Sequence, residues 1–273
     1  MKKEIDKQLD RLAKKEFKIL NKEENKLFKT KIEPVMDIIQ GKIPERLNNL
    51  LETAFFKGFK LVFEKGHSFI DKTYNKDKLK MEYAYNNIEV NKKMSSWRMR
   101  KLGKQSRQSQ RVSSLISVVE GGLLGALGIG LPDIPLFISV IIRNINEIAY
   151  SYGYSPEKEE EKGYILLLIC GAITRGEQQK DFNGHIEQIG RNIDQHMSSG
   201  ISLDDQMKVT AKVLSESMLT AKFIQGIPIV GVIGGVVNYS IINRIGEYSS
   251  LKYKKRYLNR KKQQCIDEKI RNT

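Results

Sequence analysis

The segment at residues 121–137, GGLLGALGIGLPDIPLF, is glycine-rich and decides how the rest of the chain is interpreted. It is not a Walker phosphate-binding loop, which needs a lysine and a hydroxyl residue directly after its last glycine, because Leu131 and Pro132 follow here. A dinucleotide-binding fingerprint also fails, since Gly128 and Gly130 run straight into proline. We interpret the segment as part of a glycine-rich apolar helical hairpin.

The corner of this hairpin is predicted at Pro132, Asp133 and Pro135. Pro132 stops the first helix, and the Asp133 side chain caps the second. Pro135 is tolerated in a first helical turn because its missing N–H is not needed there. The second helix is predicted over residues 134–152.

Apolar residues elsewhere recur every three or four positions, which is typical of helices. Helices are predicted over residues 5–20, from about Pro44 to Val62, and more weakly over residues 78–94. In the second arm of the hairpin, Arg143 and Glu147 are spaced as an i,i+4 ion pair. The fold class is therefore all-α, a single helical domain around the hairpin with a charged N-terminal helical extension. The predicted parts are residues 1–30 (extension), 31–262 (helical domain) and 263–273 (polar tail).

The formal net charge of +15 and the pI near 9.6 predict an anionic partner: lipid headgroups, nucleic acid or an acidic protein. Lysine outnumbers arginine, whereas base readers rely on the forked arginine side chain, so we expect no sequence-specific nucleic acid partner. The spacing of residues predicts neither a cofactor nor a metal, and the oligomeric state is left open.

Basic clusters flank the apolar part of the chain and are the predicted lipid- or anion-binding residues. Each cationic side chain next to an anionic leaflet is worth about 1 kcal/mol. The alternative is that both clusters are solvated helix faces. Trp97 and the tyrosines at 248, 253 and 257 are either interfacial anchors or edges of the core. The clusters are Arg98, Arg100, Lys101, Lys104, Arg107 and Arg111 before the apolar block, and Lys252, Lys254, Lys255, Arg256, Arg260, Lys261 and Lys262 after it.

No catalytic signature is present. The histidines are too scattered for a zinc site, and no Gly-x-Ser-x-Gly elbow occurs. Cys170 and Cys265 are predicted to be reduced structural thiols. Glu120 and Asp133 lie in apolar surroundings, where burial could raise the pKa and make either carboxylate functional. The simpler interpretation is an ion pair for Glu120 and a helix cap for Asp133.

Three segments resemble the EcsC protein family: LPDIPLFISVIIRNINEIAYSYGYSP, IPIVGVIGGVVNYSIINRIGEYSSLKYKKRYL and IPERLNNLLETAFFKGFKLVFEKG. The resemblance covers roughly residues 30–262, and its Asp-Ile-Pro hairpin with Tyr-Gly-Tyr is the most specific portion. The family is named after a bacterial locus that also encodes an ABC transporter, and it has no established biochemical activity. The resemblance therefore implies no catalytic residues.

We expect a non-enzymatic accessory protein, cytoplasmic and peripheral to the inner face of the cell membrane, that binds anionic lipid through its basic flanks. An ABC transporter or another membrane protein is a further expected partner. The hairpin arms carry glycines and charges, so we expect a buried hairpin that meets the membrane interface rather than a stable span. Two alternatives are open: a membrane-inserting or pore-forming effector, and a lipid-directed, hydrolase-like enzyme.

Overall fold

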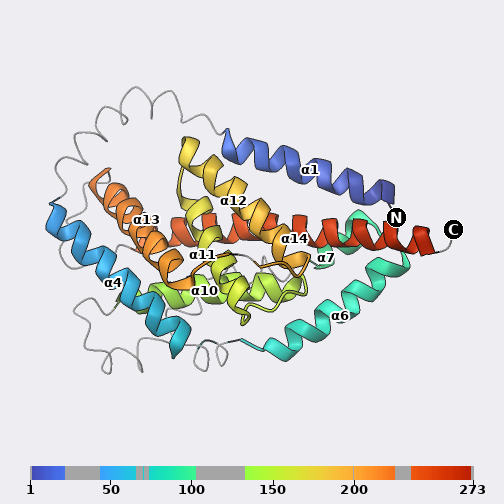
Figure 1. Ribbon diagram of the computed structural model, residues 1–273, viewed down its shortest axis with the longest axis horizontal. Helices are drawn as coiled ribbons and strands as arrows, with labels where there is room; N and C mark the ends of the chain where they lie inside the picture. The colour runs from blue at the N-terminus through green and yellow to red at the C-terminus, as the bar shows by residue number, and fades with distance from the viewer. Residues whose placement is uncertain are drawn as a thin grey trace.

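The computed structural model describes residues 2–21, 44–65, 70, 74–102, 133–198, 200–224 and 235–271 (Figure 1). Within these ranges the regular structure is helical and no strand occurs, which confirms the all-α fold class. The helices are α1 (Lys2–Leu20), α4 (Glu45–Glu64), α6 (Lys76–Lys92), α7 (Ser96–Leu102), α10 (Asp133–Ser151), α11 (Glu159–Ile173), α12 (Gly176–Asp194), α13 (Leu203–Ile224) and α14 (Gly235–Arg271).

Helix α11 forms the centre of the core. Every residue from 163 to 173 is buried, because α12, α13 and α14 pack around it. Its sequence there is almost entirely apolar, as expected for a helix that is covered on all sides. The helix begins with Glu159, Glu160 and Glu161, whose negative charges favour a helix N-terminus.

Helix α10 is the predicted second arm of the hairpin and packs against α4, α6 and α14. Its observed start at residue 133 and end at residue 151 agree with the prediction, and Pro135 lies in the first turn. The Arg143 Nε–Glu147 Oε1 distance is 2.7 Å, which confirms the predicted ion pair. A close approach to α4 depends on Gly58, where an added Cβ would lie 2.6 Å from Ile138 Cδ1.

Some hairpin predictions fall outside the described residues. Pro132, Glu120 and the glycine-rich arm at 121–131 are among these, and so is the side chain of Asp133. The predicted cap therefore stays a prediction. Within the part of the chain that the structure describes, none of the helices combines the length and apolarity needed to cross a bilayer.

Helix α14 has 37 residues and a length of about 55 Å at 1.5 Å per residue. It runs through the molecule, and α1 lies along its C-terminal half in the opposite direction (Figure 1). The predicted polar tail at 263–273 continues α14 as far as Arg271. The predicted boundary near residue 30 lies outside the described residues, whereas α1 itself packs against the helical domain.

Candidate functional site

Three residues of the predicted basic cluster on α14 are buried, and its other four are half-buried. Lys252 is 1% exposed and Arg256 is 6% exposed. These two residues are four positions apart and so lie on one face of the helix. That face packs against α1, α11 and α12, and each of these helices supplies a carboxylate to it.

Arg256 joins two helices through its guanidinium group. Its Nη2 donates to Glu161 Oε1 at 2.8 Å and to Asp194 Oδ1 at 2.7 Å, while Nε donates to Asp194 Oδ2 at 3.1 Å. Burial alone would lower the pKa of Arg256, but the charge of Glu161, the hydrogen bond to Asp194 and the neighbouring tyrosines together outweigh burial, and the pKa is raised. The arginine is therefore held as a cation by α11 and α12.

Tyrosine rings enclose this guanidinium. Its central carbon lies 4.2 Å from the ring centre of Tyr154 and 4.4 Å from that of Tyr164, so the cation is stacked between two aromatic faces. Tyr253 donates its hydroxyl to Glu161 Oε2 at 3.0 Å. Burial, and after it the charge of Glu161, raise the pKa of Tyr253, so this phenol stays protonated. The cluster holds helices together and contains no activated nucleophile.

A second ion cluster ties α1 and α12 to α14. Lys252 donates to Glu16 and, at 2.6 Å, to Glu187 Oε1. Lys255 donates to Glu16 Oε2 at 2.6 Å and lies 3.1 Å from Glu187 Oε1. Burial would raise the pKa of Glu187, but Lys252 and Lys255 outweigh it and hold the pKa below its usual value. Glu187 is therefore an ionised partner of Lys252 and Lys255, and Glu16 accepts hydrogen bonds from the same two lysines.

The remaining residues of the predicted basic cluster on α14 also have partners inside the chain. Lys254 contacts Gln8, and Lys262 lies 2.8 Å from Asp6 Oδ1. Lys261 donates to Asn91 Oδ1 at 2.8 Å. Arg260 donates to the carbonyl of Tyr152 at 3.1 Å and to the hydroxyl of Tyr83 at 3.2 Å. In this conformation a headgroup reaches Lys252 or Arg256 only if neighbouring helices move.

The Tyr-Gly-Tyr turn and the basic-aromatic segment of α14 contact each other. Gly153 has φ +76° and ends α10, with its N–H donating to Tyr150 and the Tyr154 N–H donating to Ala149, which is a Schellman cap. The turn places Tyr152 6.1 Å from Tyr257 and Tyr154 5.2 Å from Tyr253, measured between ring centres. Two of the three segments on which the family resemblance rests are thus packed against each other.

An exposed apolar and basic surface lies on α6 and α7, and we call it the α6–α7 surface. Met81, Tyr85 and Ile88 follow each other at spacings of four and three on one face of α6, and Lys78 and Lys92 bound this stripe. All three apolar side chains are exposed, as is Trp97 on α7, at 62%. The surface consists of Lys78, Met81, Tyr85, Ile88, Lys92, Lys93, Trp97, Arg98 and Lys101.

Lys101 connects the two helices of this surface. Its Nζ lies 5.4 Å from the ring centre of Tyr85 and 5.6 Å from that of Trp97, so both rings hold one cation. Arg98 is half-buried and pairs with Glu89 at 3.4 Å. Residues 75–102 contain eight basic and three acidic residues, an excess of five positive charges, although Lys78, Lys92 and Arg98 each lie within 4.0 Å of a glutamate of α6.

The prediction for the first basic cluster is only partly covered by these observations. Arg98 and Lys101 belong to the α6–α7 surface, whereas the Arg100 side chain, Lys104, Arg107 and Arg111 lie outside the described residues. Sequence reasoning missed the stripe on α6. The i,i+4,i+7 spacing of Met81, Tyr85 and Ile88 between two lysines was the signal that could have revealed it.

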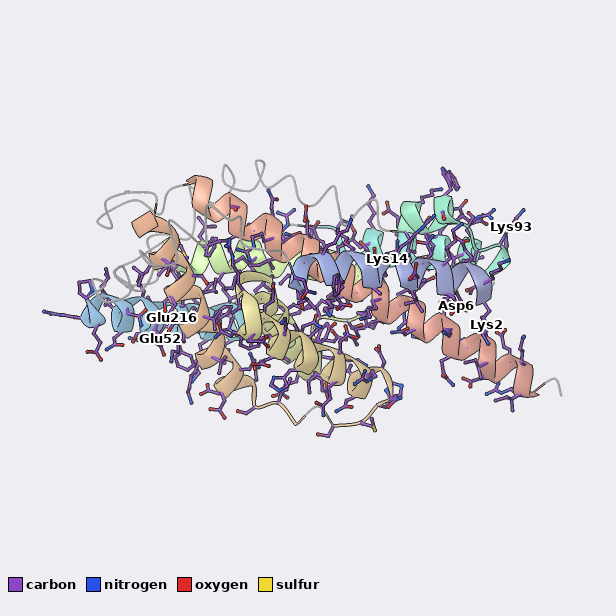
Figure 2. All side chains as sticks on the ribbon, turned by 90° about the horizontal axis from the view of Figure 1, so that it is seen from above. Lys2, Asp6, Lys14, Glu52, Lys93 and Glu216 are labelled. Atoms are coloured by element: carbon purple, nitrogen blue, oxygen red, sulfur yellow. The ribbon has the colours of Figure 1, made fainter. Side chains whose placement is uncertain are left out.

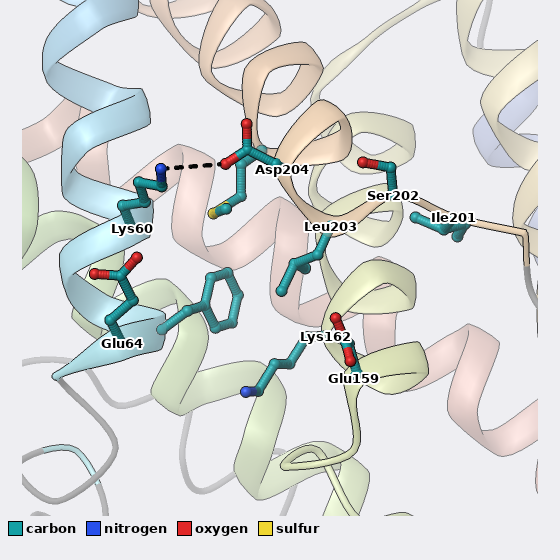
Figure 3. A pocket seen from close by; sticks show the side chains of 10 residues that line it. Lys60, Glu64, Glu159, Lys162, Ile201, Ser202, Leu203 and Asp204 are labelled. Atoms are coloured by element: carbon teal, nitrogen blue, oxygen red, sulfur yellow. Dashed lines mark ion pairs between the residues drawn. The ribbon is translucent and has the colours of Figure 1, made fainter.

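An open cleft of about 480 Å³ lies between the end of α4 and the starts of α11 and α13 (Figure 3). Apolar side chains including Phe63, Leu203 and Met207 line it together with charged groups of both signs, and Lys60 pairs with Asp204 at 3.4 Å. Ser202 accepts a hydrogen bond from the Asp205 N–H and so caps α13. Ser202, the hydroxyl residue of this lining, therefore serves the helix start rather than a nucleophile–base pair.

The remaining candidates for chemistry are the two cysteines and two of the histidines. Burial raises the pKa of the Cys170 thiol to about 12, and both cysteines are free and buried, as predicted for structural thiols. His185 and His196 are exposed. Within the described ranges no group of three or more His, Cys, Asp or Glu side chains is placed to hold a metal ion.

Comparison with known proteins identifies relatives. A sequence model of the EcsC protein family matches residues 6–258. Protein EcsC of Bacillus subtilis (strain 168) is 22% identical to this chain over 213 residues, which cover 77% of this chain and 80% of the relative. No solved structure matches. Because the family match spans most of its length, from α1 into α14, the chain belongs to the EcsC protein family.

Proposed function

We propose that this EcsC-family chain is a non-enzymatic protein that binds the surface of an anionic membrane from the cytoplasmic side. The observation that carries the proposal is the α6–α7 surface. Trp97 and Tyr85 are exposed aromatic side chains of the kind that insert at the level of lipid headgroups, and lysines surround them. Residues 75–102, with eight basic and three acidic residues, carry the net positive charge that an anionic leaflet attracts.

The proposal places the main lipid contact on α6 and α7 rather than on α14. The basic residues of α14 from 252 to 262 are buried or half-buried and contact acidic, amide and backbone groups of this chain, whereas Lys92, Lys93 and Lys101 are exposed, with Lys92 lying 3.5 Å from Glu89. The segment at 103–111 adds Lys104, Arg107 and Arg111 to the same stretch of sequence. The membrane-bound chain would then contact an ABC transporter or another membrane protein at the membrane surface.

Flotation with lipid vesicles tests the proposal. We expect the chain to float with vesicles that contain phosphatidylglycerol, to stay unbound with pure phosphatidylcholine, and to be released by high salt because the contact is electrostatic. Replacing both Lys92 and Lys93 with glutamine should weaken binding. The matched control makes the same change of charge at two exposed lysines, Lys57 on α4 and Lys65 directly after it, on the opposite side of Figure 1 from α6.

The aromatic contribution is tested separately. Tyr85→Ala should weaken vesicle binding, whereas Leu50→Ala on α4 should not, although the two side chains are 59% and 56% exposed. Equal effects of the two substitutions would contradict the assignment of the contact to α6 and α7. Binding that resists salt and carbonate, with leakage of a trapped dye, would favour the inserting alternative.

A further inference from the structure

Helix α1 is held on the rest of the molecule by an apolar stripe and by polar contacts. Its buried apolar side chains are Ile5 and Leu12, while Leu9 and Ile19 are partly buried against the core. These four positions lie on one face, so α1 is an amphipathic helix with a narrow apolar stripe. The other contacts are ion pairs and hydrogen bonds to α7 and α14.

The acidic residues of α1 are divided between two faces. Glu16 lies against α14 and receives hydrogen bonds from Lys252 and Lys255, and Asp6 lies 2.8 Å from Lys262 Nζ. Asp10 instead pairs with Lys14 on α1 itself, and both of these side chains are exposed. The acids at 6 and 16 therefore neutralise a basic face of α14.

The composition of α1 suits a lipid surface as well as it suits α14. The helix has seven basic and four acidic residues, and its apolar stripe has the spacing of a helix that lies in a membrane interface. On leaving α14 for such an interface, the stripe would be buried again among acyl chains. Lipid phosphates would replace Glu16 and Asp6 as partners of the lysines on α14.

The N-terminal part of α1 lies next to the α6–α7 surface. A move of α1 from α14 to lipid would therefore take place beside that surface. Ser96, the residue before Trp97, donates its hydroxyl to Glu4 at 2.8 Å and accepts a hydrogen bond from Gln8 at 2.8 Å. Figure 2 shows Lys2 and Asp6 of α1 at the same end of the molecule as Lys93. A bilayer that meets Trp97 would therefore also meet the N-terminal part of α1.

We infer that α1 is an exchangeable helix, which covers the basic face of α14 in this structure and transfers to an anionic lipid surface when the protein binds one. The transfer uncovers Lys252, Lys255 and Lys262 and so enlarges the lipid-binding surface. This inference rests on the proposed function, since it adds a step to binding by α6 and α7.

The charge contacts of Glu16 provide the first test. Glu16→Gln removes a charge that holds α1 on α14, so we expect roughly fivefold to tenfold tighter binding to phosphatidylglycerol vesicles than for the control. The matched control is Asp10→Asn, which makes the same change of charge on the same helix, where Asp10 pairs with Lys14 of α1 itself. Asp6→Asn, whose ion pair with Lys262 is exposed, should act in the same direction even if Glu16→Gln destabilises the fold.

The movement itself is measured by the distance between spin labels. Cysteines at Lys14 on α1 and Gln188 on α12, both exposed, would carry the labels, and the unsubstituted chain would show that buried Cys170 and Cys265 do not react. We expect one distance in solution and with phosphatidylcholine, and a longer one with phosphatidylglycerol vesicles. An unchanged distance in bound protein, or equal affinities of the Glu16→Gln and Asp10→Asn variants, would overturn the exchange while leaving the proposed function intact. Absence of binding in every variant would overturn both.

Discussion

Replacing Arg256 with methionine removes the guanidinium that Glu161 and Asp194 share. Glu161 is 2% exposed, so its carboxylate would stay buried without this cation. Removing one partner of a buried ion pair costs about 3–5 kcal/mol, because the remaining charge is left without compensation. The stacking of the guanidinium on Tyr154 and Tyr164 is lost as well. We therefore expect the free energy of unfolding to fall by about 3–5 kcal/mol.

Urea denaturation followed by circular dichroism measures this change. A loss of this size corresponds to a Tm lower by roughly 6–20 °C, at about 2–4 °C per kcal/mol for a domain of 150–250 residues. Arg191 is exposed on α12, and Arg191→Met should change the stability by less than about 0.5 kcal/mol. Combining Arg256→Met with Glu161→Gln should recover part of the loss, because the second change removes the uncompensated carboxylate.

One result would refute this reasoning. If Arg256→Met keeps its stability within about 1 kcal/mol of the parent chain and loses binding to anionic vesicles, Arg256 is a lipid contact rather than a structural cation. The basic cluster of α14 would then act as the sequence suggested, and the burial of Arg256 between α11 and α12 would not describe the protein in solution.

Three further predictions concern the turn after α10, the core thiol and the response to acid. Gly153→Ala should destabilise the fold by more than about 1 kcal/mol, since φ is +76° and the new Cβ would lie 2.2 Å from the Tyr83 ring. Gly184→Ala, where the added Cβ meets nothing within 4 Å, should be neutral or stabilising in urea denaturation. A Gly184→Ala variant less stable than Gly153→Ala would contradict the described conformation of the turn at Gly153. Cys170, with its pKa raised to about 12, should resist a thiol reagent at pH 8 until urea unfolds the chain, and rapid labelling of the native protein would contradict its burial. The lowered pKa of Glu187 means that its stabilising contribution is present above its unfolded pKa near 4.5 and is lost as the pH falls through the folded value. The midpoint of urea denaturation should fall between pH 7 and pH 3 in the parent chain, and it should fall less in Glu187→Gln. Identical pH profiles of the two proteins would argue against the ion cluster around Glu187.

Features that depend on neighbouring residues could be predicted from the sequence. Proline near the corner and the long apolar run after it located α10 to within one residue at each end. The Arg143–Glu147 pair followed from their spacing of four, because residues at that spacing adjoin on any helix. The burial of Cys170 followed from the apolar run around it.

The environment of the α14 cations could not be predicted in the same way. The partners of Lys252 and Arg256 lie 236, 65, 95 and 62 positions away in the sequence, so local spacing carries no information about them. One signal was available. Lys252, Arg256 and Arg260 recur every four residues among tyrosines, which predicts one helix face that is both cationic and aromatic. Such a face is typical of a membrane interface and equally of a buried ion-pair cluster.

The ion pairs of α14 affect where on the protein the net positive charge lies. Buried Lys252 and Arg256 have acidic residues against them, whereas buried Lys261 donates to the side-chain amides of Asn91 and Gln264, so Lys252 and Arg256 contribute little to the excess of 15 positive charges. The excess must therefore lie where acids are scarce, and residues 75–102, with eight basic and three acidic residues, form one such stretch.

Helix α7 ends at Leu102, and residues 112–142 begin ten positions later with only Glu120 and Asp133 as charged residues. Ten residues reach at most about 35 Å. A bilayer bound by Trp97 would thus hold the start of the apolar segment within that distance of the lipid surface, which is why the α6–α7 surface, rather than α14, is the place to test whether the hairpin contacts lipid.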